Sequence, residues 1–129
     1  MNIKHINPDS LPRNPAFAQA VSVQNPGTLI YVGGQNGIGA DGELVGADLA
    51  SQAEQALRNV LAALEAAGAR QENVLKLTVH VVQGHPVEEA FGAAQKVWGT
   101  NATAVTVLVV AGLANPAFLI EVDAVAAVA

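Results

Sequence analysis

The segment DLASQAEQALRNVLAALEAAG, residues 48–68, decides the fold. Its apolar residues recur at the three- and four-residue spacing of one helix face. Asp48 stands where a helix N-cap belongs, and Gly68 stands where a helix commonly ends. The pattern predicts a helix that lays one apolar stripe on a sheet, and the stripe comprises Leu49, Ala53, Ala56, Leu57, Val60, Leu61 and Leu64.

Short apolar segments rich in β-forming residues lie before and after this helix and are typical of strands. Strands are predicted before the helix at 3–6, 17–23 and 28–34, and after it at 73–82, 104–113 and 118–128. Residues 7–15 hold three prolines and are predicted to form a loop.

A second helix is predicted over residues 86–100, between the fourth and fifth strands. Its inward residues are expected to be Val87, Ala90, Phe91, Ala94 and Val97 or Trp98. The resulting order is three strands, a helix, a strand, a helix and two strands. That order predicts an α+β protein in which two helices cover one face of a single sheet.

The chain closes with AFLIEVDAVAAVA, residues 117–129, an apolar segment that nevertheless carries Glu121 and Asp123. Residues two apart in a strand point to the same side of a sheet. One interpretation is a stripe of carboxylates that faces solvent, as carboxylates usually do. The other is that Glu121 lies in a cleft and polarises a water molecule as a general base. The strand pattern alone leaves both interpretations open.

Length and composition indicate one domain spanning residues 1–129. Hydrophobic residues make up 51% of the chain and charged residues only 13%, which is more apolar than an average soluble domain. The last two strands are apolar enough to need cover on the face that the helices leave open. We therefore expect a homo-oligomer in which a neighbouring subunit supplies that cover.

Charge and residue content exclude several classes of function. The net charge of −5 disfavours binding to nucleic-acid phosphates. The absence of cysteine excludes disulfides, thiolate ligands and a cysteine nucleophile. The N-terminus lacks the apolar core of a signal peptide, and the longest apolar run, 104–114, is too short to span a bilayer. We expect a cytoplasmic protein that does not associate with membranes.

No motif in the chain predicts a cofactor or a metal. GIGADG, residues 37–42, matches the glycine pattern of dinucleotide-binding loops, but no helix opens directly from it, so a glycine-rich turn explains it better. His5, His80 and His85 have neither the spacing nor the partners of a metal site and are expected at the surface.

Three segments together resemble the Rid family, also called YjgF/YER057c/UK114: GGQ at 33–35, QAEQALRNVLAALEAAG at 52–68 and IEVDAVA at 120–126. The resemblance covers nearly the whole chain. It implies a chorismate-mutase-like fold, in which three subunits pack their sheets into a barrel-like core with clefts between neighbours. It also implies hydrolysis of reactive enamines and imines to 2-keto acids and ammonia.

The resemblance also implies roles for particular residues. The family glutamate that positions the attacking water falls on Glu121, and the family tyrosine near the N-terminus falls on Phe17. The arginine that clamps the substrate carboxylate falls on Val105, and a family cysteine falls on Val107. Further substrate contacts are implied at the end of the GGQ strand, on Gly33, Gly34 and Gln35.

The missing arginine is the main departure from the family pattern. No Arg or Lys occurs from 97 to 129, so no shift of register restores it. Loss of a charge-assisted anchor costs about 1.5–3 kcal/mol, and a cleft lined by Phe17, Val105 and Val107 favours a neutral or more hydrophobic substrate. Arg13 lies in the proline-rich loop and is a candidate replacement, while an exposed loop arginine is the alternative.

Three functions compete at this point. The first is a Rid-like imine or enamine hydrolase with an altered substrate range, in which Glu121 positions water. The second is a trimer that binds a small metabolite without catalysis. The third is a ribonuclease or translation inhibitor, which the acidic composition disfavours. The first is favoured because a glutamate on an apolar strand is costly to keep without a partner or a role.

Overall fold

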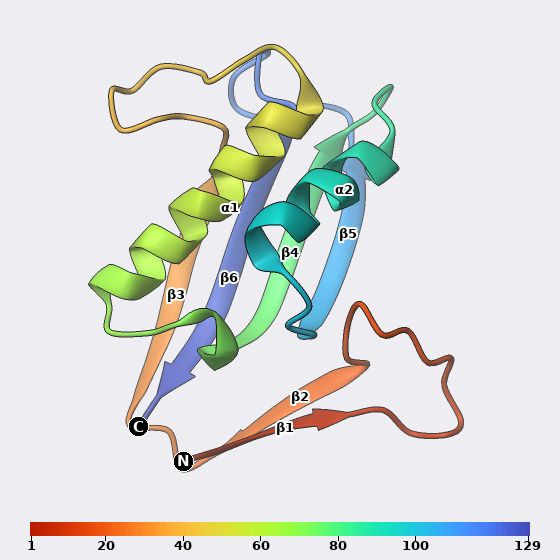
Figure 1. Cartoon of the computed structure of the whole chain (residues 1–129), viewed down its shortest axis with the longest axis vertical. Helices are drawn as coiled ribbons and strands as arrows, with labels where there is room; N and C mark the ends of the chain where they lie inside the picture. The colour runs from red at the N-terminus through yellow and green to blue at the C-terminus, as the bar shows by residue number, and fades with distance from the viewer.

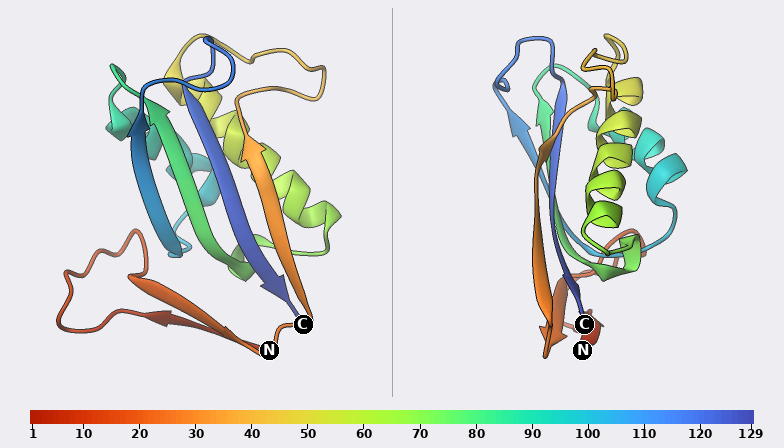
Figure 2. Two further views of the ribbon diagram at one scale, coloured as in Figure 1. Left: turned by 180° about the vertical axis from the view of Figure 1, so that it is seen from behind. Right: turned by 90° about the vertical axis from the view of Figure 1, so that its left-hand side faces the viewer.

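Two helices cover one face of a four-stranded sheet in the computed structural model, which describes residues 1–129 (Figure 1). Seen edge on, both helices lie on the same side and the other face of the sheet is uncovered (Figure 2). This confirms the predicted α+β class. The helices are α1, Leu49–Ala66, and α2, Val87–Trp98, and the strands, in their order across the sheet, are β3, Thr28–Gln35, β6, Ile120–Val128, β4, Val74–Val82, and β5, Ala104–Val110.

The sheet is mixed, with antiparallel and parallel strand pairs. Strand β6 lies in the interior of the sheet, antiparallel to β3 on one side and to β4 on the other. Strand β5 pairs in parallel with β4 and forms an edge. The pairings place the C-terminal segment, far from β3 and β4 in sequence, between these two strands.

The N-terminal strands do not join this sheet, which corrects the expectation of a single one. Strands β1, Asn2–Ile6, and β2, Ala20–Gln24, pair only with each other (Figure 1). Asn25 follows β2 with a φ of 52°, and this turn sends β2 away from β3. The predicted strand 17–23 therefore begins later, and one bridge from Ala18 to Ala104 ties the segment before β2 to β5.

Helix α1 forms as predicted. The Asp48 side chain accepts a hydrogen bond from the Ser51 backbone N–H at 2.9 Å, and Gly68 follows the helix with a φ of 81°. Leu61 is half-buried, whereas the polar Gln52 is fully buried. Gln52 donates to the carbonyls of Gly46 and Ala117 and accepts from the Leu119 N–H, so its burial leaves no polar group unpaired.

Helix α2 buries Ala90, Ala93 and Trp98. Phe91, predicted to be packed inward, is 47% exposed instead. The side chain borders an open cavity between α2 and the sheet rather than filling it.

Strand β6 separates its two faces by alternation. Ile120, Val122 and Ala124 are buried against the helices. Glu121 and Asp123 are half-buried on the open face of the sheet, so they do point to the same side, as predicted.

Candidate functional site

Glu121 lies on the open face near the end of β3 and is the centre of the candidate site. It stands opposite His80 in the antiparallel β4–β6 pair, and His80 in turn stands beside Leu108 of β5. His80 Nδ1 lies 3.3 Å from the Glu121 backbone oxygen. The sequence predicted that His80 lies at the surface. In the structure this histidine is instead half-buried beside the glutamate.

Gly34 makes room for the Glu121 carboxylate. A Cβ atom at Gly34 would lie 2.7 Å from both Cδ and Oε2 of Glu121, which is closer than non-bonded atoms approach. The pairing of β3 with β6 shifts register between Val32 and Gln35, so Gly33 and Gly34 have no residue partner on β6. Gln35 folds back, and its amide donates to the Gly33 carbonyl at 3.1 Å. The structure thus places Gly34 against the Glu121 side chain, with Gly33 and Gln35 next to Gly34 in the chain.

Asn36 holds the carboxylate from one side. Its Nδ2 group donates to Glu121 Oε1 at 3.3 Å and to the Ile120 carbonyl at 3.0 Å. Because its amide bonds both the side chain and the strand backbone, Asn36 fixes the glutamate relative to β6. No protein group donates to Oε2, so this oxygen is available to a water molecule or a ligand.

Helix α1 holds Asn36 in place. Asn59 Nδ2 donates to the carbonyls of Asn36 at 3.0 Å and of Ile38 at 2.8 Å, and Gln55 donates to Asn59 Oδ1 at 2.9 Å. Sequence reasoning missed Asn36 and Asn59. The signal present in the sequence was an amide at 59 within the predicted helix and an amide directly after GGQ.

Val105 and Val107 lie on the other side of the sheet from Glu121. Val105 pairs with Leu77 and Val107 pairs with Val79, and all four pack toward the helical layer. Within one chain, therefore, the expected cleft shared with Glu121 does not form. The reason is the alternation of side chains along a strand. Glu121 is in register with His80, and the side chain of His80 points to the face opposite that of its chain neighbour Val79.

Phe17 does lie with the two valines. Together with α2 they border a cavity of about 500 Å³ between the sheet and α2. The lining is mainly apolar, with Phe91 and Trp98 on its helical side. The structure therefore divides the expected site residues into two groups: Glu121 with Gly33, Gly34 and Gln35 on the open face, and Phe17 with Val105 and Val107 on the helical face.

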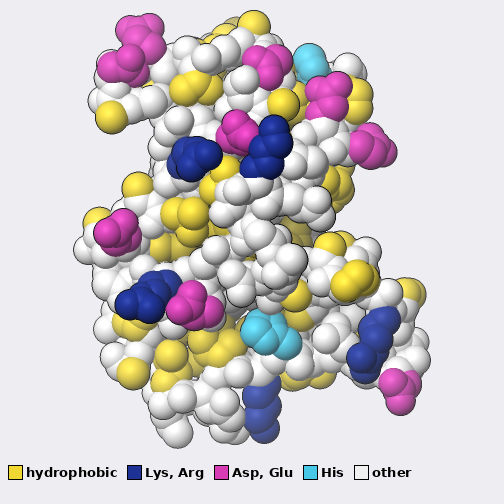
Figure 3. All heavy atoms as spheres, in the orientation of Figure 1, with side chains coloured by type: hydrophobic (Ala, Val, Ile, Leu, Met, Phe, Trp, Pro, Cys, Tyr) yellow, Lys and Arg dark blue, Asp and Glu magenta, His cyan; other side chains and the backbone are white.

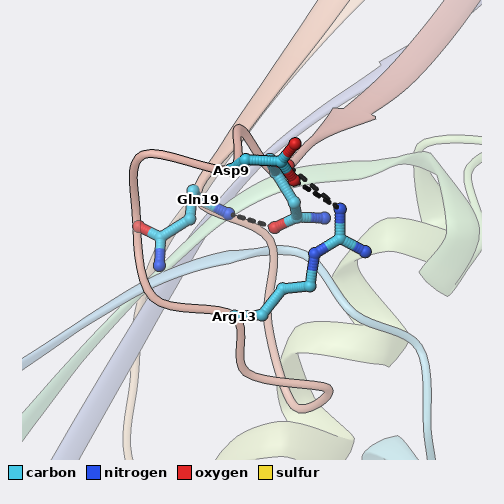
Figure 4. A network of polar contacts seen from close by, with 4 residues as sticks. Asp9, Arg13 and Gln19 are labelled. Atoms are coloured by element: carbon cyan, nitrogen blue, oxygen red, sulfur yellow. Dashed lines mark hydrogen bonds and ion pairs between the residues drawn. The ribbon is translucent and has the colours of Figure 1, made fainter.

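Arg13 lies near the second group. Its Nη2 atom donates to the Asn7 carbonyl at 3.2 Å and lies 3.9 Å from Asp9 Oδ1 (Figure 4). Arg13 borders a smaller hollow of about 290 Å³, and Phe17 lines both this hollow and the larger cavity. The arginine is thus placed beside Phe17 and not beside Glu121.

Charge and ligand-forming groups are sparse. Acidic and basic side chains are interspersed over the helical face, which shows no basic patch (Figure 3). No three His, Asp or Glu side chains gather as metal ligands would. None of the helices is both long and apolar enough to cross a membrane.

A mixed sheet with two helices on one face places the chain in the class of α+β proteins with the chorismate-mutase-like fold. Residues 10–128 match the family model described as Endoribonuclease L-PSP. A Rid-family protein of unknown function from Yersinia pestis, YyfB, is 35% identical over 99% of this chain and 100% of its own, with a TM-score of 0.87. The chain therefore belongs within this class to the Rid family, also called YjgF/YER057c/UK114.

Curated relatives match over shorter regions. A 2-iminobutanoate/2-iminopropanoate deaminase from Rattus norvegicus is 45% identical over 65 residues, which are 50% of this chain and 45% of the rat protein. A RutC family protein from Pyrococcus abyssi is 38% identical over 66 residues, half of each chain. The match spans about half the length of these curated relatives.

Proposed function

We propose that this protein hydrolyses an imine or enamine with release of ammonia, and that Glu121 positions the attacking water. The observation that carries the proposal is the half-buried Glu121 carboxylate, with Oε1 held by Asn36 and Oε2 left without a protein donor beside Gly34. A fixed carboxylate with one free oxygen is suited to orient water as a general base. The deaminase name of the rat relative supports this chemistry.

In the proposed reaction, water oxygen forms a bond to the carbon of the C=N group while Glu121 takes a proton from the water. Glu121 passes this proton to the substrate nitrogen, which gives a carbinolamine, and an enamine enters this step as its imine tautomer. The C–N bond then breaks as the proton of the carbinolamine hydroxyl is transferred to the nitrogen, so the electron pair leaves with ammonia, the carbonyl forms and Glu121 ends as the carboxylate. One water is consumed for each ammonia released, and nothing is oxidised or reduced. Backbone groups of Gly33 and Gly34, unpaired in the ladder, are proposed to contact the substrate.

The substrate is proposed to lack a compact carboxylate beside Glu121. No arginine or lysine side chain bonds to Glu121, and the only lysine of β4, Lys76, donates to Thr106 Oγ1 at 2.7 Å. A bidentate arginine is the usual anchor for a planar carboxylate. A neutral or more hydrophobic imine therefore suits this site better than a small 2-imino acid.

A homotrimer is proposed to complete the site. Leu29, Tyr31 and Leu108 expose apolar surface on the open face, where a neighbouring chain would cover it. Three of the expected site residues face the other side of the sheet, namely Phe17, Val105 and Val107. They share a cleft with Glu121 only if they come from a neighbouring subunit. Their role in substrate binding is therefore part of the same proposal.

The deciding experiment measures ammonia release from 2-aminoacrylate, bulkier imino acids and uncharged imines generated in situ. Wild type is expected to turn over at least one uncharged or bulky imine, and Glu121→Gln is expected to lose about 10²-fold or more of that rate, since general-base catalysis contributes on this scale. Glu65→Gln, an exposed glutamate on α1, serves as the matched control. Equal rates for Glu121→Gln and wild type would refute the role of Glu121.

A binding protein without turnover is the second candidate, and the apolar cavity beside α2 is the observation that favours it. Saturable binding with no ammonia release from any imine would favour this function. Ribonuclease activity is the least supported by the charge pattern, despite the name of the matched family model. RNA binding is expected to be absent even at low salt, where phosphate contacts are strongest.

A further inference from the structure

Asn36 and Gly37 form the single Asn-Gly pair in the chain. Each of the two residues has its own structural reason to be there. Asn36 holds the Glu121 carboxylate through Nδ2, which lies 3.3 Å from Oε1, and a Cβ at position 37 would lie 2.6 Å from Gln52 Cα. The fold therefore places the residue that has no side chain directly after the amide that bonds the glutamate.

An Asn-Gly pair is chemically reactive. The backbone nitrogen of the second residue can attack the side-chain Cγ of the asparagine, and a glycine has no Cβ that would hinder the approach. Asparagine is accordingly one of the residues that limit the chemical durability of proteins. Every other asparagine of this chain precedes Pro, Ile, Val or Ala, so the following residue either lacks an N–H or carries a Cβ.

The backbone at Asn36 supports this attack. The Asn36 carbonyl oxygen accepts from the Ile38 N–H at 2.8 Å and from Asn59 Nδ2 at 3.0 Å. Because this carbonyl shares a peptide unit with the Gly37 nitrogen, both donors stabilise the negative charge that the unit acquires when the nitrogen loses its proton. The Gly37 N–H donates to no protein group although the residue is buried, which is uncommon in folded proteins. No protein hydrogen bond therefore has to break before this nitrogen attacks.

Water reaches the side-chain amide of Asn36. The residue is half-buried, and its Oδ1 atom accepts no hydrogen bond from the protein. Since no buried side-chain oxygen or nitrogen in the structure lacks a partner, Oδ1 is in contact with solvent. The water needed for hydrolysis is thus available at this position.

We propose that Asn36 is a deamidation site, and that its conversion to aspartate or isoaspartate switches off the Glu121 site. The Gly37 nitrogen forms a bond to Asn36 Cγ, the bond from Cγ to Nδ2 breaks, and Nδ2 leaves as ammonia with the proton of the Gly37 N–H. Water then opens the resulting succinimide at either carbonyl, and the ring nitrogen regains a proton. Each chain consumes one water and releases one ammonia, once, and nothing is oxidised or reduced.

The modification acts on Glu121 directly. Asn36 Nδ2 is the protein donor to Glu121 Oε1, and it also bonds the Ile120 carbonyl at 3.0 Å. A carboxylate at position 36 can donate to neither oxygen and sets a like charge against Glu121, which displaces the glutamate or makes one of the two groups hold a proton. Either change removes the general base. The loss of turnover rests on the proposed function, whereas the deamidation itself does not.

Incubation of folded wild type at mildly alkaline pH tests the proposal. Anion exchange is expected to resolve a growing, more acidic form, and peptide mapping by mass spectrometry is expected to place aspartate and isoaspartate at position 36. Asn73 and Asn101, which precede Val and Ala, are controls within the same chain and are expected to remain amides. Imine turnover is expected to fall in proportion to the converted fraction.

Two variants separate the added charge from the lost donor. Asn36→Asp reproduces the aspartate product and is expected to lose about 10²-fold or more of imine turnover, the scale of general-base catalysis. Asn36→Ala removes the donor without adding a charge and is expected to lose about tenfold, the scale of one hydrogen bond to a charged group. Circular dichroism checks the fold of both, and the incubated wild type decides the proposal where either variant does not fold.

Persistence of the amide at position 36 would overturn the proposal, as would conversion of Asn73 or Asn101 at the rate of Asn36. Full turnover by the converted form, or equal turnover by Asn36→Asp and Asn36→Ala, would overturn the switch. A wild type without imine turnover would refute the proposed hydrolysis instead. In that case mass and charge still decide whether Asn36 deamidates, and an unchanged carbon-13 NMR signal of the Glu121 carboxyl after conversion would overturn its effect on the site.

Discussion

At the residue scale, the position of the Glu121 carboxylate depends on the lack of a side chain at Gly34 and on the side-chain amide of Asn36. Gly34 leaves the volume that the carboxylate occupies, and Asn36 donates to one of its oxygens. The surrounding strands carry no cation against it, so steric space and one hydrogen bond set its geometry. Substitution of Gly34 therefore tests this geometry directly.

Gly34→Ala is expected to reduce imine turnover about 10²-fold, since misplacement of a reacting group by about 1 Å has effects of that size. The new Cβ would meet the end of the Glu121 side chain at 2.7 Å and displace it. Gly112→Ala is the matched control, because a Cβ there also meets nothing within 4 Å and Gly112 lies in the loop after β5, outside the proposed site. Steady-state ammonia release measures both, and equal losses for the two variants would contradict this role of Gly34.

Asp48 gives a prediction about pH. Hydrogen bonds from the Ser51 backbone and side chain hold the pKa of the Asp48 carboxyl below its ordinary value. Because the pKa is lowered on folding, the stabilisation is fully present above about pH 4, where the unfolded carboxyl titrates, and is lost as the pH falls through the lower folded pKa.

Asp48→Asn keeps a capping side chain but removes its charge. It is expected to melt below wild type at pH 6, and the two melting temperatures are expected to converge as the pH falls below about 4. Thermal melts followed at 222 nm measure this difference, and Glu72→Gln serves as the exposed control. A difference in melting temperature between wild type and Asp48→Asn that grew toward acid pH would contradict this prediction.

At the element scale, α1 does more than cover the sheet. Gln52 bonds Gly46 in the loop before α1 and Ala117 in the segment before β6. Asn59 bonds the carbonyls of Asn36 and Ile38. The loop after β3 packs so closely on α1 that a Cβ at Gly37 would lie 2.6 Å from Gln52 Cα. The helix therefore positions the glutamate indirectly, through the segment that carries Asn36.

Asn59→Leu is expected to lower the free energy of unfolding by about 2 kcal/mol, because two half-buried carbonyls lose their side-chain donor. Gln55→Leu, which removes only the contact to Asn59 Oδ1, is expected to lower it by less than about 1 kcal/mol. Urea denaturation measures both values. Equal effects would contradict the role of Asn59 as the clamp on this loop.

At the scale of the whole molecule, the uncovered sheet face is the dominant feature. Helices cover one side only (Figure 2). The open side combines exposed apolar residues with the polar positions of β4 and β6. An apolar face of this kind is usually covered by another protein surface. The proposed trimer supplies that cover with copies of the same chain.

Leu108→Glu is expected to convert the proposed trimer to monomer, because a charge on the covered face would lose its hydration. Val45→Glu is the matched control, since Val45 is 44% exposed against 45% for Leu108 but lies in the loop before α1. Size-exclusion chromatography with light scattering gives the masses. A monomeric wild type, or equal masses for the two variants, would contradict the proposed interface.

The sequence by itself determined the element order, both helices, the alternation of β6 and the family, because these follow from periodicity, capping residues and local motifs. The tertiary structure alone decided which residues meet. Register between β4, β5 and β6 put Val105 and Glu121 on opposite faces, and a bulge in β3 brought Gly34 against Glu121. Strand register and long-range amide contacts join residues distant in the chain, so no local pattern encodes them.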